Sequence, residues 1–400
     1  MSPLHRLWRT LPQGPRRRAA LAVLRSLAPR PRQPGPRAGA GAIVAGELGL
    51  GSGLGMHARL DLAALQASGE AAWALDIPMP SGGFRDGRQD IREFPPDAPL
   101  LLHVNGPMVP YALLRLPRAL VRNRRIAGTW AWELPQVPKA WRVGVPFVHE
   151  VWSPSTFTAN AMRAFLPASI PVRVVPIPVA VTPPVPSAID RAGFGLPADA
   201  VVTLCSFNLA SSLVRKNPLA TIAAHRAAFG DRADRILVLK IGNPEHFPAD
   251  MEIIRAAVAG AANIRIETRM LPDADTHALT ACADIVISLH RSEGFGLVPA
   301  EAMLLGRAVV ATGWSGNMDY MDEHSAALVT PRLVPAVDPR GVFDAPGAVW
   351  ADPDPLQAAE HLRRLADDPE ARVALGGRAR VRATASLGYG PLREAMAAMR

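Results

Sequence analysis

The sequence predicts an α/β protein built from two Rossmann-like lobes that face a cleft, and three observations support this fold class. The chain has 400 residues, more than one ordinary domain usually contains. Short apolar runs alternate with stretches whose apolar residues recur at helical spacing, a pattern typical of parallel sheets covered by helices. A proline-rich stretch at 176–197 separates two such series. We therefore expect a first lobe at 41–185 and a second lobe at 186–385.

The first lobe begins with a strand, a glycine-rich turn and a helix, which together open a Rossmann-like unit. The turn covers 49–55, and the helix follows at 56–68, where apolar residues fall at helical spacing before Gly69. Strands are expected at 41–46, 71–76, 100–104 and 172–178.

The second lobe continues this alternation. Strands are expected at 201–207, 236–241, 263–267, 284–289 and 307–312. Helices are expected at 218–229, 250–260, 274–282 and 299–305. Residues 355–385 also have a helical pattern, and we expect the C-terminal segment 386–400 to pack back on the first lobe.

The composition excludes several classes of protein. Hydrophobic residues make up 49% of the chain and charged residues 20%, which excludes a disordered or fibrous protein. No apolar run reaches about 18 residues, so no membrane-spanning helix is expected. The two cysteines, Cys205 and Cys282, are too few for a disulfide framework or a zinc site. These features predict a cytoplasmic protein.

The net charge of +9 comes from one end of the chain. Residues 1–40 contain nine arginines and no acidic residue, so the remaining residues carry 35 basic and 35 acidic side chains. A neutral body argues against a nucleic-acid partner. The simplest interpretation of 1–40 is a disordered, basic Pro/Arg-rich tail. The alternative is a segment that associates peripherally with anionic lipid at the inner face of the cell membrane.

The most informative segment, 288–303, runs from the end of a strand through a glycine turn into a helix. Pro299 suits the first helical position, which places Glu301 in the first turn of the helix. A helix N-terminus of this kind binds phosphate, and Glu293 precedes the turn. Two carboxylates beside a phosphate site suggest sugar hydroxyls as their partners. The alternative is an ordinary turn with a capping carboxylate.

This segment resembles the retaining GT-B glycosyltransferases of the family-4, group-1 type. Their signature is a glutamate, seven residues and a second glutamate, in the form E-G-F-G-x-x-x-x-E, which this chain carries from Glu293 to Glu301. The resemblance continues through 130–135, 150–155, 215–218, 306–312 and 316–317. It covers nearly the whole chain after the tail, from about 43 to 385.

The resemblance implies a role for each matching residue. Glu301 would hold the ribose hydroxyls of a nucleotide-sugar donor, and Glu293 would contact hydroxyls of the transferred sugar. Backbone amides near the donor would come from Gly294, Phe295 and Gly296. In the first lobe, the loop with Ser52 and Gly53 would close on the diphosphate.

Cations for the diphosphate are expected from the few lysines. The chain has only three lysines against 41 arginines, so the lysines are expected where a compact ammonium is needed. The resemblance implies that Lys216, in the loop before a helix, neutralises the diphosphate with Arg215 as a helper. Lys240, at a strand end, is a further donor-binding candidate, with chance retention as its alternative, whereas Lys139 is expected at the surface.

Two departures from the family pattern affect the expected site. Many relatives have a His-x-His pair at the end of a first-lobe strand, and here the pair reads His103-Val104-Asn105. Asn105 is therefore the catalytic candidate at the place near the reacting sugar, and His103 is expected to be a structural strand histidine. Many relatives also have an arginine about six residues before the lysine, where this chain has Ala210.

The resemblance implies retention of configuration at the anomeric carbon, by same-face attack of the acceptor. The leaving diphosphate would take the acceptor proton, stabilised by Lys216 and helix amides, so no cofactor and no metal are expected. The D-x-D triplets at Asp273–Asp275 and Asp352–Asp354 are interpreted as turn residues. The tryptophans at 130, 132, 141 and 152 are expected in the core rather than in an acceptor platform.

The acceptor is expected to be a glycan or glycolipid, since relatives commonly build bacterial cell-surface polysaccharide, lipopolysaccharide or glycolipid. Two other functions remain open. A sugar- or nucleotide-binding relative could have lost its chemistry with the change at Asn105. A nicotinamide-dependent dehydrogenase would explain the glycine turn and Asp76, although the turn never reads G-x-G-x-x-G.

Overall fold

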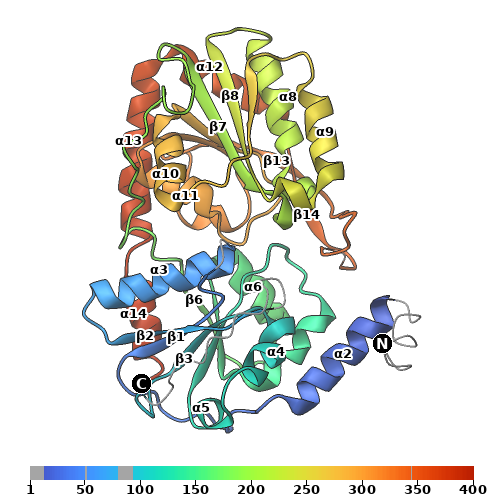
Figure 1. Cartoon of the computed structure of the whole chain (residues 1–400), viewed down its shortest axis with the longest axis vertical. Helices are drawn as coiled ribbons and strands as arrows, with labels where there is room; N and C mark the ends of the chain where they lie inside the picture. Colours follow the sequence, from blue (N-terminus) through green and yellow to red (C-terminus); the bar gives the residue numbers. More distant parts are fainter. Residues whose placement is uncertain (1–12, 50–51, 80–92, 344) are drawn as a thin grey trace.

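The computed structural model describes residues 13–49, 52–79, 93–343 and 345–400. Two sheets of six parallel strands form two lobes, and the first lobe lies below the second in Figure 1. Helices cover both sheets, as alternating strands and helices require. The predicted α/β architecture with two Rossmann-like lobes is confirmed.

The first sheet contains the four predicted strands and two more. Its strands are β1 (Ala42–Gly46), β2 (Ala72–Asp76), β3 (Leu100–His103), β4 (Ile126–Thr129), β5 (Glu150–Ser153) and β6 (Val172–Val174). They lie in the order β2-β1-β3-β4-β5-β6. The strands β4 and β5 were not among those predicted from the sequence. The helices of this lobe are α3 (Gly53–Ala67), α4 (Val109–Leu114), α5 (Arg118–Arg122) and α6 (Thr156–Phe165).

The second sheet contains the five predicted strands and one more at its edge. Its strands are β7 (Val201–Asn208), β8 (Arg235–Gly242), β9 (Ile264–Glu267), β10 (Ile285–Ser288), β11 (Ala308–Thr312) and β12 (Ala327–Val329). They lie in the order β12-β11-β10-β7-β8-β9. The helices are α7 (Leu213–Lys216), α8 (Pro218–Phe229), α9 (Pro248–Val258), α10 (Asp273–Cys282) and α11 (Leu297–Leu304). Thus α8 begins and ends where the sequence predicts.

An antiparallel hairpin that the sequence analysis did not anticipate follows the second sheet. It pairs β13 (Pro331–Pro335) with β14 (Val349–Pro353). The segment between these strands carries Phe343, whose ring packs against Trp132 of the first lobe with a centroid distance of 5.4 Å. The hairpin therefore joins the core of the first lobe and links the two lobes.

The N-terminal segment differs from the expected disordered tail over the residues that the structure describes. Residues 13–27 form helix α2 (Gln13–Leu27), and the buried Ala28 follows it. Leu21 and Leu24 are half-buried on the face of α2 that packs on the first lobe. Further along, the amide of Ala38 donates to the carbonyl of Met399 at 3.1 Å. Residues 1–12 lie outside the described residues.

Three helices end the chain: α12 (Pro355–Asp367), α13 (Pro369–Ser386) and α14 (Gly390–Ala397). In Figure 1 the chain runs along the second lobe through α13 and returns to the first lobe at α14. There Leu392 and Met396 pack with Val44 and Leu65 in one apolar cluster. The chain therefore crosses between the lobes twice, and the exact lobe boundaries at 185–186 and 385–386 stay predictions.

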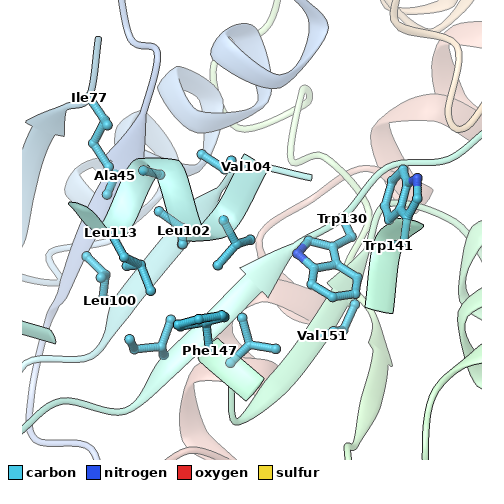
Figure 2. Close-up of a cluster of buried hydrophobic side chains, with 14 of the residues drawn as sticks. Ala45, Ile77, Leu100, Leu102, Val104, Leu113, Trp130, Trp141, Phe147 and Val151 are labelled. Carbon is cyan, nitrogen blue, oxygen red and sulfur yellow. The ribbon is translucent and has the colours of Figure 1, made fainter. Parts of the chain in front are cut away.

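Apolar clusters pack on both faces of the first sheet, and Trp152 lies in a different cluster from the other three predicted tryptophans. Figure 2 shows Leu100 and Leu102 of β3 beside Phe147, with Trp130 and Trp141 at one end of the cluster. All four tryptophans in question are at most 5% exposed: Trp130, Trp132, Trp141 and Trp152. Their predicted core role is confirmed.

None of the helices in the described part of the chain has an apolar stretch of the length that a lipid bilayer requires.

Candidate donor site at the contact between the lobes

The glycine turn of the signature segment starts α11 earlier than the sequence predicts. Gly296 takes a left-handed φ of +95°, which glycine adopts without strain, and caps the helix. Leu297 is consequently the first helical residue and Pro299 the third. Glu301 is the fifth, so it lies just beyond the first turn rather than within it, and this expectation was wrong.

The carboxylate of Glu293, which precedes this turn, forms ion pairs with two basic side chains. Its Oε1 lies 2.5 Å from Nζ of Lys216, and its Oε2 lies 3.2 Å from Nη1 of Arg215. The Glu293 side chain is 11% exposed, that of Arg215 3% and that of Lys216 20%. Lys216 and Glu293, 77 residues apart in the sequence, thus form one buried charge cluster with Arg215.

The cluster holds Glu293 ionised. Burial alone would raise the pKa of Glu293, but the charges of Lys216 and Arg215 outweigh burial and lower the pKa to about 2. For Arg215, burial opposes the charged form, yet Glu293 and Glu133 raise the pKa of its guanidinium. The side chain of Lys216 is the most exposed of the three, so it is the one best able to reach a ligand.

Both cations come from α7, a short helix where the sequence analysis expected a loop. Ser212 caps α7 with a φ of +75°, and Asn217 ends it in the left-handed region at +52°. The side-chain amide of Asn217 donates to the carbonyl of Leu289 at 3.0 Å, just after β10. This bond fixes α7 beside the segment that carries Glu293.

The same segment contacts the first lobe. Oγ of Ser155 donates to the carbonyl of Gly294 at 2.6 Å. Oγ1 of Thr158 lies 2.8 Å from the carbonyl of Trp132 and 3.3 Å from that of Gly294. Ser155 caps α6, so this first-lobe helix begins directly against the glycine turn of the second lobe.

Glu133 of the first lobe adds a fourth charge that sequence reasoning did not assign a role. Its Oε1 lies 3.9 Å from Nη2 of Arg215, and its carbonyl accepts a hydrogen bond from Ser292. Burial raises the pKa of Glu133 against the opposing effect of Arg215. The signal was present in the segment 130–135, which belongs to the family pattern.

Glu301 lies on α11 in a different electrostatic setting. Burial, and then the charge of Asp273, raises the pKa of Glu301 to about 8. Its side chain is 18% exposed, and Nε2 of His277 lies 4.0 Å away. At neutral pH Glu301 can therefore both donate and accept hydrogen bonds, which suits paired hydroxyl groups.

The D-x-D triplets are not turn residues throughout, as the sequence analysis interpreted them. Asp273 and Asp275 lie in the first turn of α10, where carboxylates are stabilised by the helix dipole. Asp352 lies in β14, with Oδ1 2.8 Å from Nη1 of Arg291. Asp354 caps α12 by accepting from the amide of Leu356. All four have local structural partners or positions.

The remaining candidates lie around the cluster or apart from it. Oδ1 of Asn105, after β3, accepts from the amide of Ala131 at 2.9 Å, next to the residues that meet Gly294. Phe295 is buried, and its ring packs against Tyr320. Nζ of Lys240 donates to the carbonyl of Arg269, and burial lowers the pKa of Lys240. Within the described part of the chain, Lys240 makes no hydrogen bond or ion pair with Glu293.

The glycine loop of the first lobe is described only in part, because Leu50 and Gly51 lie outside the described residues. Ser52 caps α3, and its Oγ accepts from the amide of Gly55 at 3.1 Å. A side chain at Gly53 would meet nothing within 4 Å, so the backbone there is accessible. Asp76 accepts from the amide of Leu48, which gives it a structural role beside this loop.

Comparisons with known proteins agree with the signature. Residues 219–352, a third of the chain, match the family model described as "Glycosyl transferases group 1". The chain is 29% identical over 237 residues to a D-inositol 3-phosphate glycosyltransferase of Kineococcus radiotolerans, covering 56% of this chain and 51% of that protein. It is 33% identical over 227 residues to a protein of the same name from Saccharomonospora viridis, covering 53% and 47%. The chain thus aligns with about half the length of these relatives.

Solved structures show the same fold over nearly the whole chain. The HepE protein of Anabaena, solved with UDP and glucose, has a TM-score of 0.62 at 14% identity, covering 90% of this chain and 99% of that one. Sucrose-phosphate synthase of Thermosynechococcus elongatus has a TM-score of 0.60 at 17% identity, covering 89% and 96%. The two facing lobes therefore form the GT-B fold.

Proposed function

We propose that this chain is a glycosyltransferase that moves a sugar from a nucleotide-sugar donor to a glycan or glycolipid acceptor with retention of anomeric configuration. One observation carries the proposal. The glycine turn, Glu293 and Lys216 converge where α11 begins and where the two lobes touch. The family match over 219–352 and the UDP-bound HepE structure, which shares the fold, support it.

Each side chain of the site would have a distinct task. Glu301 would hold the ribose hydroxyls, since its raised pKa leaves it able to donate as well as accept. When the donor binds, the ammonium of Lys216 would exchange its ion pair with Glu293 for one with the diphosphate, which carries more negative charge than one carboxylate. Arg215 is buried, so it would act by keeping Glu293 ionised and oriented toward the sugar.

Retention would follow from attack of the acceptor on the face that the diphosphate leaves. The acceptor oxygen would lose its proton to the leaving diphosphate, whose negative charge Lys216 and amides near Gly294 and Gly296 would stabilise. This scheme requires no metal at the diphosphate. Asn105 lies in the first lobe beside Ala131 and would contact the transferred sugar from that side.

A nucleotide screen tests the donor site. The screen contains UDP, GDP, ADP and NAD. We expect the melting temperature to rise with one of the nucleoside diphosphates, because a ligand at about 100 times its Kd adds about 2.7 kcal/mol. Glu301→Ala should lose most of this shift, since two hydrogen bonds from one side chain contribute about 1–3 kcal/mol.

The matched control for that screen is Glu360→Ala, on α12 and exposed, which should keep the full shift. A shift unchanged in Glu301→Ala would contradict the ribose contact. A nucleotide response without sugar transfer to any acceptor would favour the non-catalytic relative, and a response to NAD alone would favour a dehydrogenase.

We also propose that the face of the first lobe around α2 associates peripherally with anionic membrane at the inner face of the cell membrane. Val23 and Leu27 of α2 are 55% and 58% exposed. Five exposed arginines line two grooves beside α2: Arg25, Arg30, Arg118, Arg122 and Arg142. Cationic and apolar groups together are what an anionic lipid surface attracts.

Vesicle co-sedimentation tests this surface. The double variant Arg118→Glu, Arg122→Glu should bind phosphatidylserine-containing vesicles at least about 30-fold more weakly, since each arginine near the surface contributes about 1 kcal/mol and each glutamate adds repulsion. The control Arg255→Glu, Arg380→Glu makes the same charge change on exposed positions of the second lobe. Equal binding by both double variants would contradict a specific membrane face.

A further inference from the structure

A cluster of polar side chains lies buried in the first lobe, outside the proposed donor site. His57 and Asp61 come from α3, and His103 ends β3. Asp61 is fully buried, and the two histidines are each 2% exposed. The i, i+4 spacing puts His57 and Asp61 on the same face of α3, which covers the sheet. Apolar residues normally occupy such positions, so three polar side chains there need an explanation.

The three side chains converge on one point. Nε2 of His103 lies 2.9 Å from Oδ2 of Asp61, and Nε2 of His57 lies 3.5 Å from the same oxygen. All three ligand atoms lie within 4.8 Å of one another. In a tetrahedral zinc site, bonds of about 2.0–2.2 Å place neighbouring ligand atoms about 3.3 Å apart. The distances of 2.9 and 3.5 Å from Oδ2 of Asp61 to the two histidine nitrogens bracket this value.

Hydrogen bonding within the protein leaves this cluster incomplete. Within the described residues, Nε2 of His57, Oδ1 of Asp61 and Nδ1 of His103 are buried and have no hydrogen-bond partner. Buried polar atoms without partners cost folding free energy. Nε2 of His103 already contacts Oδ2 of Asp61, so the unpaired Nε2 of His57, 3.5 Å from that oxygen, is the atom that points to a bound group. A cation would engage the unpaired nitrogen of His57 and the unpaired oxygen of Asp61 together.

We propose that His57, Asp61 and His103 bind one divalent transition metal ion, best fitted by zinc, which ties α3 to β3. Two imidazoles and a carboxylate are zinc ligands, whereas magnesium and calcium prefer oxygen ligands throughout. Because the cluster is buried, both oxygens of Asp61 complete the coordination and no position is open to substrate. The ion is structural, and it acts at a place other than the donor diphosphate.

The proposed metal site lies next to two parts of the first lobe that are expected to contact the donor. Helix α3, which Ser52 caps, begins at the glycine loop. Asn105 lies two residues after His103 in the sequence. Gly46 of β1 pairs with His103, and a side chain at Gly46 would come within 3.1 Å of Cβ of His103. The ion therefore holds the glycine loop and Asn105 in a fixed relation.

Metal binding is measured on the full chain after tag removal and treatment with EDTA, without any nucleotide. We expect one Zn²⁺ per chain to be retained through desalting, and one Co²⁺ to give the visible absorption of a four-coordinate site. His57→Gln and His103→Gln should each weaken Zn²⁺ affinity by more than about tenfold. Even the loss of a hydrogen bond to a metal-binding side chain lowers metal affinity about 10- to 100-fold.

The matched control is His225→Gln, which removes another buried histidine far from this cluster and should bind Zn²⁺ as the wild type does. Circular dichroism of each variant reports whether it folds. Absence of stoichiometric binding to the wild type overturns the proposal without any variant. Equal affinity in wild type and both cluster variants also overturns it, because binding would then come from exposed histidines such as His246 or His324.

Discussion

Replacing Lys216 with alanine should lower kcat about 100- to 1,000-fold, with a smaller effect on donor affinity. Negative charge on the diphosphate grows as the sugar leaves, so a cation there stabilises the transition state more than the ground state. Lys216 is the member of the buried cluster with the most exposed side chain, at 20%, and it already binds a carboxylate. Steady-state kinetics of sugar transfer, with kcat and KM separated, provide the measurement.

The chain offers a matched control, because Lys139 is an exposed lysine at the start of a short helical turn. Lys139→Ala should keep wild-type kcat. If the two lysine variants have the same kinetics, Lys216 has no part in catalysis. If Lys216→Ala lowers kcat and donor affinity by equal factors, the lysine contributes plain ground-state binding instead.

Glu293→Gln should lower the free energy of unfolding at pH 7 by about 3–5 kcal/mol, which is the usual result of breaking a buried ion pair. The change keeps the shape of the side chain but leaves Arg215, 3% exposed, without its 3.2 Å partner. Glu133 at 3.9 Å compensates only in part, since burial favours its neutral form. Urea denaturation of both proteins measures the difference.

The pH dependence of this difference follows from the lowered pKa of Glu293. Its folded pKa of about 2 lies below the ordinary value of 4.5, so the unfolded chain takes up a proton first as the pH falls. The stabilisation is therefore complete above about pH 5 and is lost as the pH falls from 4.5 toward 2. Wild type and Glu293→Gln should converge in stability at acid pH.

Glu323→Gln is the control for both measurements. Its side chain is 80% exposed, so the substitution should change the free energy of unfolding by less than about 0.5 kcal/mol at every pH. A difference between wild type and Glu293→Gln that is the same at pH 4 and pH 7 would mean that the loss comes from packing rather than from charge.

Much of the architecture can be predicted from sequence because its signals are local. A proline starts α8, Gly230 ends it, and the prediction of 218–229 agrees with both limits. The apolar runs of β7 and β8 are long enough to identify buried strands. Errors occur where one residue changes the local geometry, as at Gly296, whose positive φ moves the start of α11 from Pro299 to Leu297.

Some residues of the site could likewise be predicted from the sequence, whereas their contacts could not. The spacing of Glu293 and Glu301 is a sequence signal, and it identified the segment that meets the first lobe. The sequence also indicated Lys216 and Arg215 as cations, without showing that both bind Glu293. Glu133 received no role, because its proximity to Arg215 exists only once the two lobes are in contact.

The two α/β lobes and the segment with the paired glutamates can be predicted from local signals, because strand length, helical period and glycine or proline positions act over a few residues. The partners of the buried charges, the docking of α2 and the contact between His103 and Asp61 become visible in the folded chain alone. Such contacts depend on strand order and on how helices cross the sheet, so residues 42 positions apart become neighbours without a local pattern that records it.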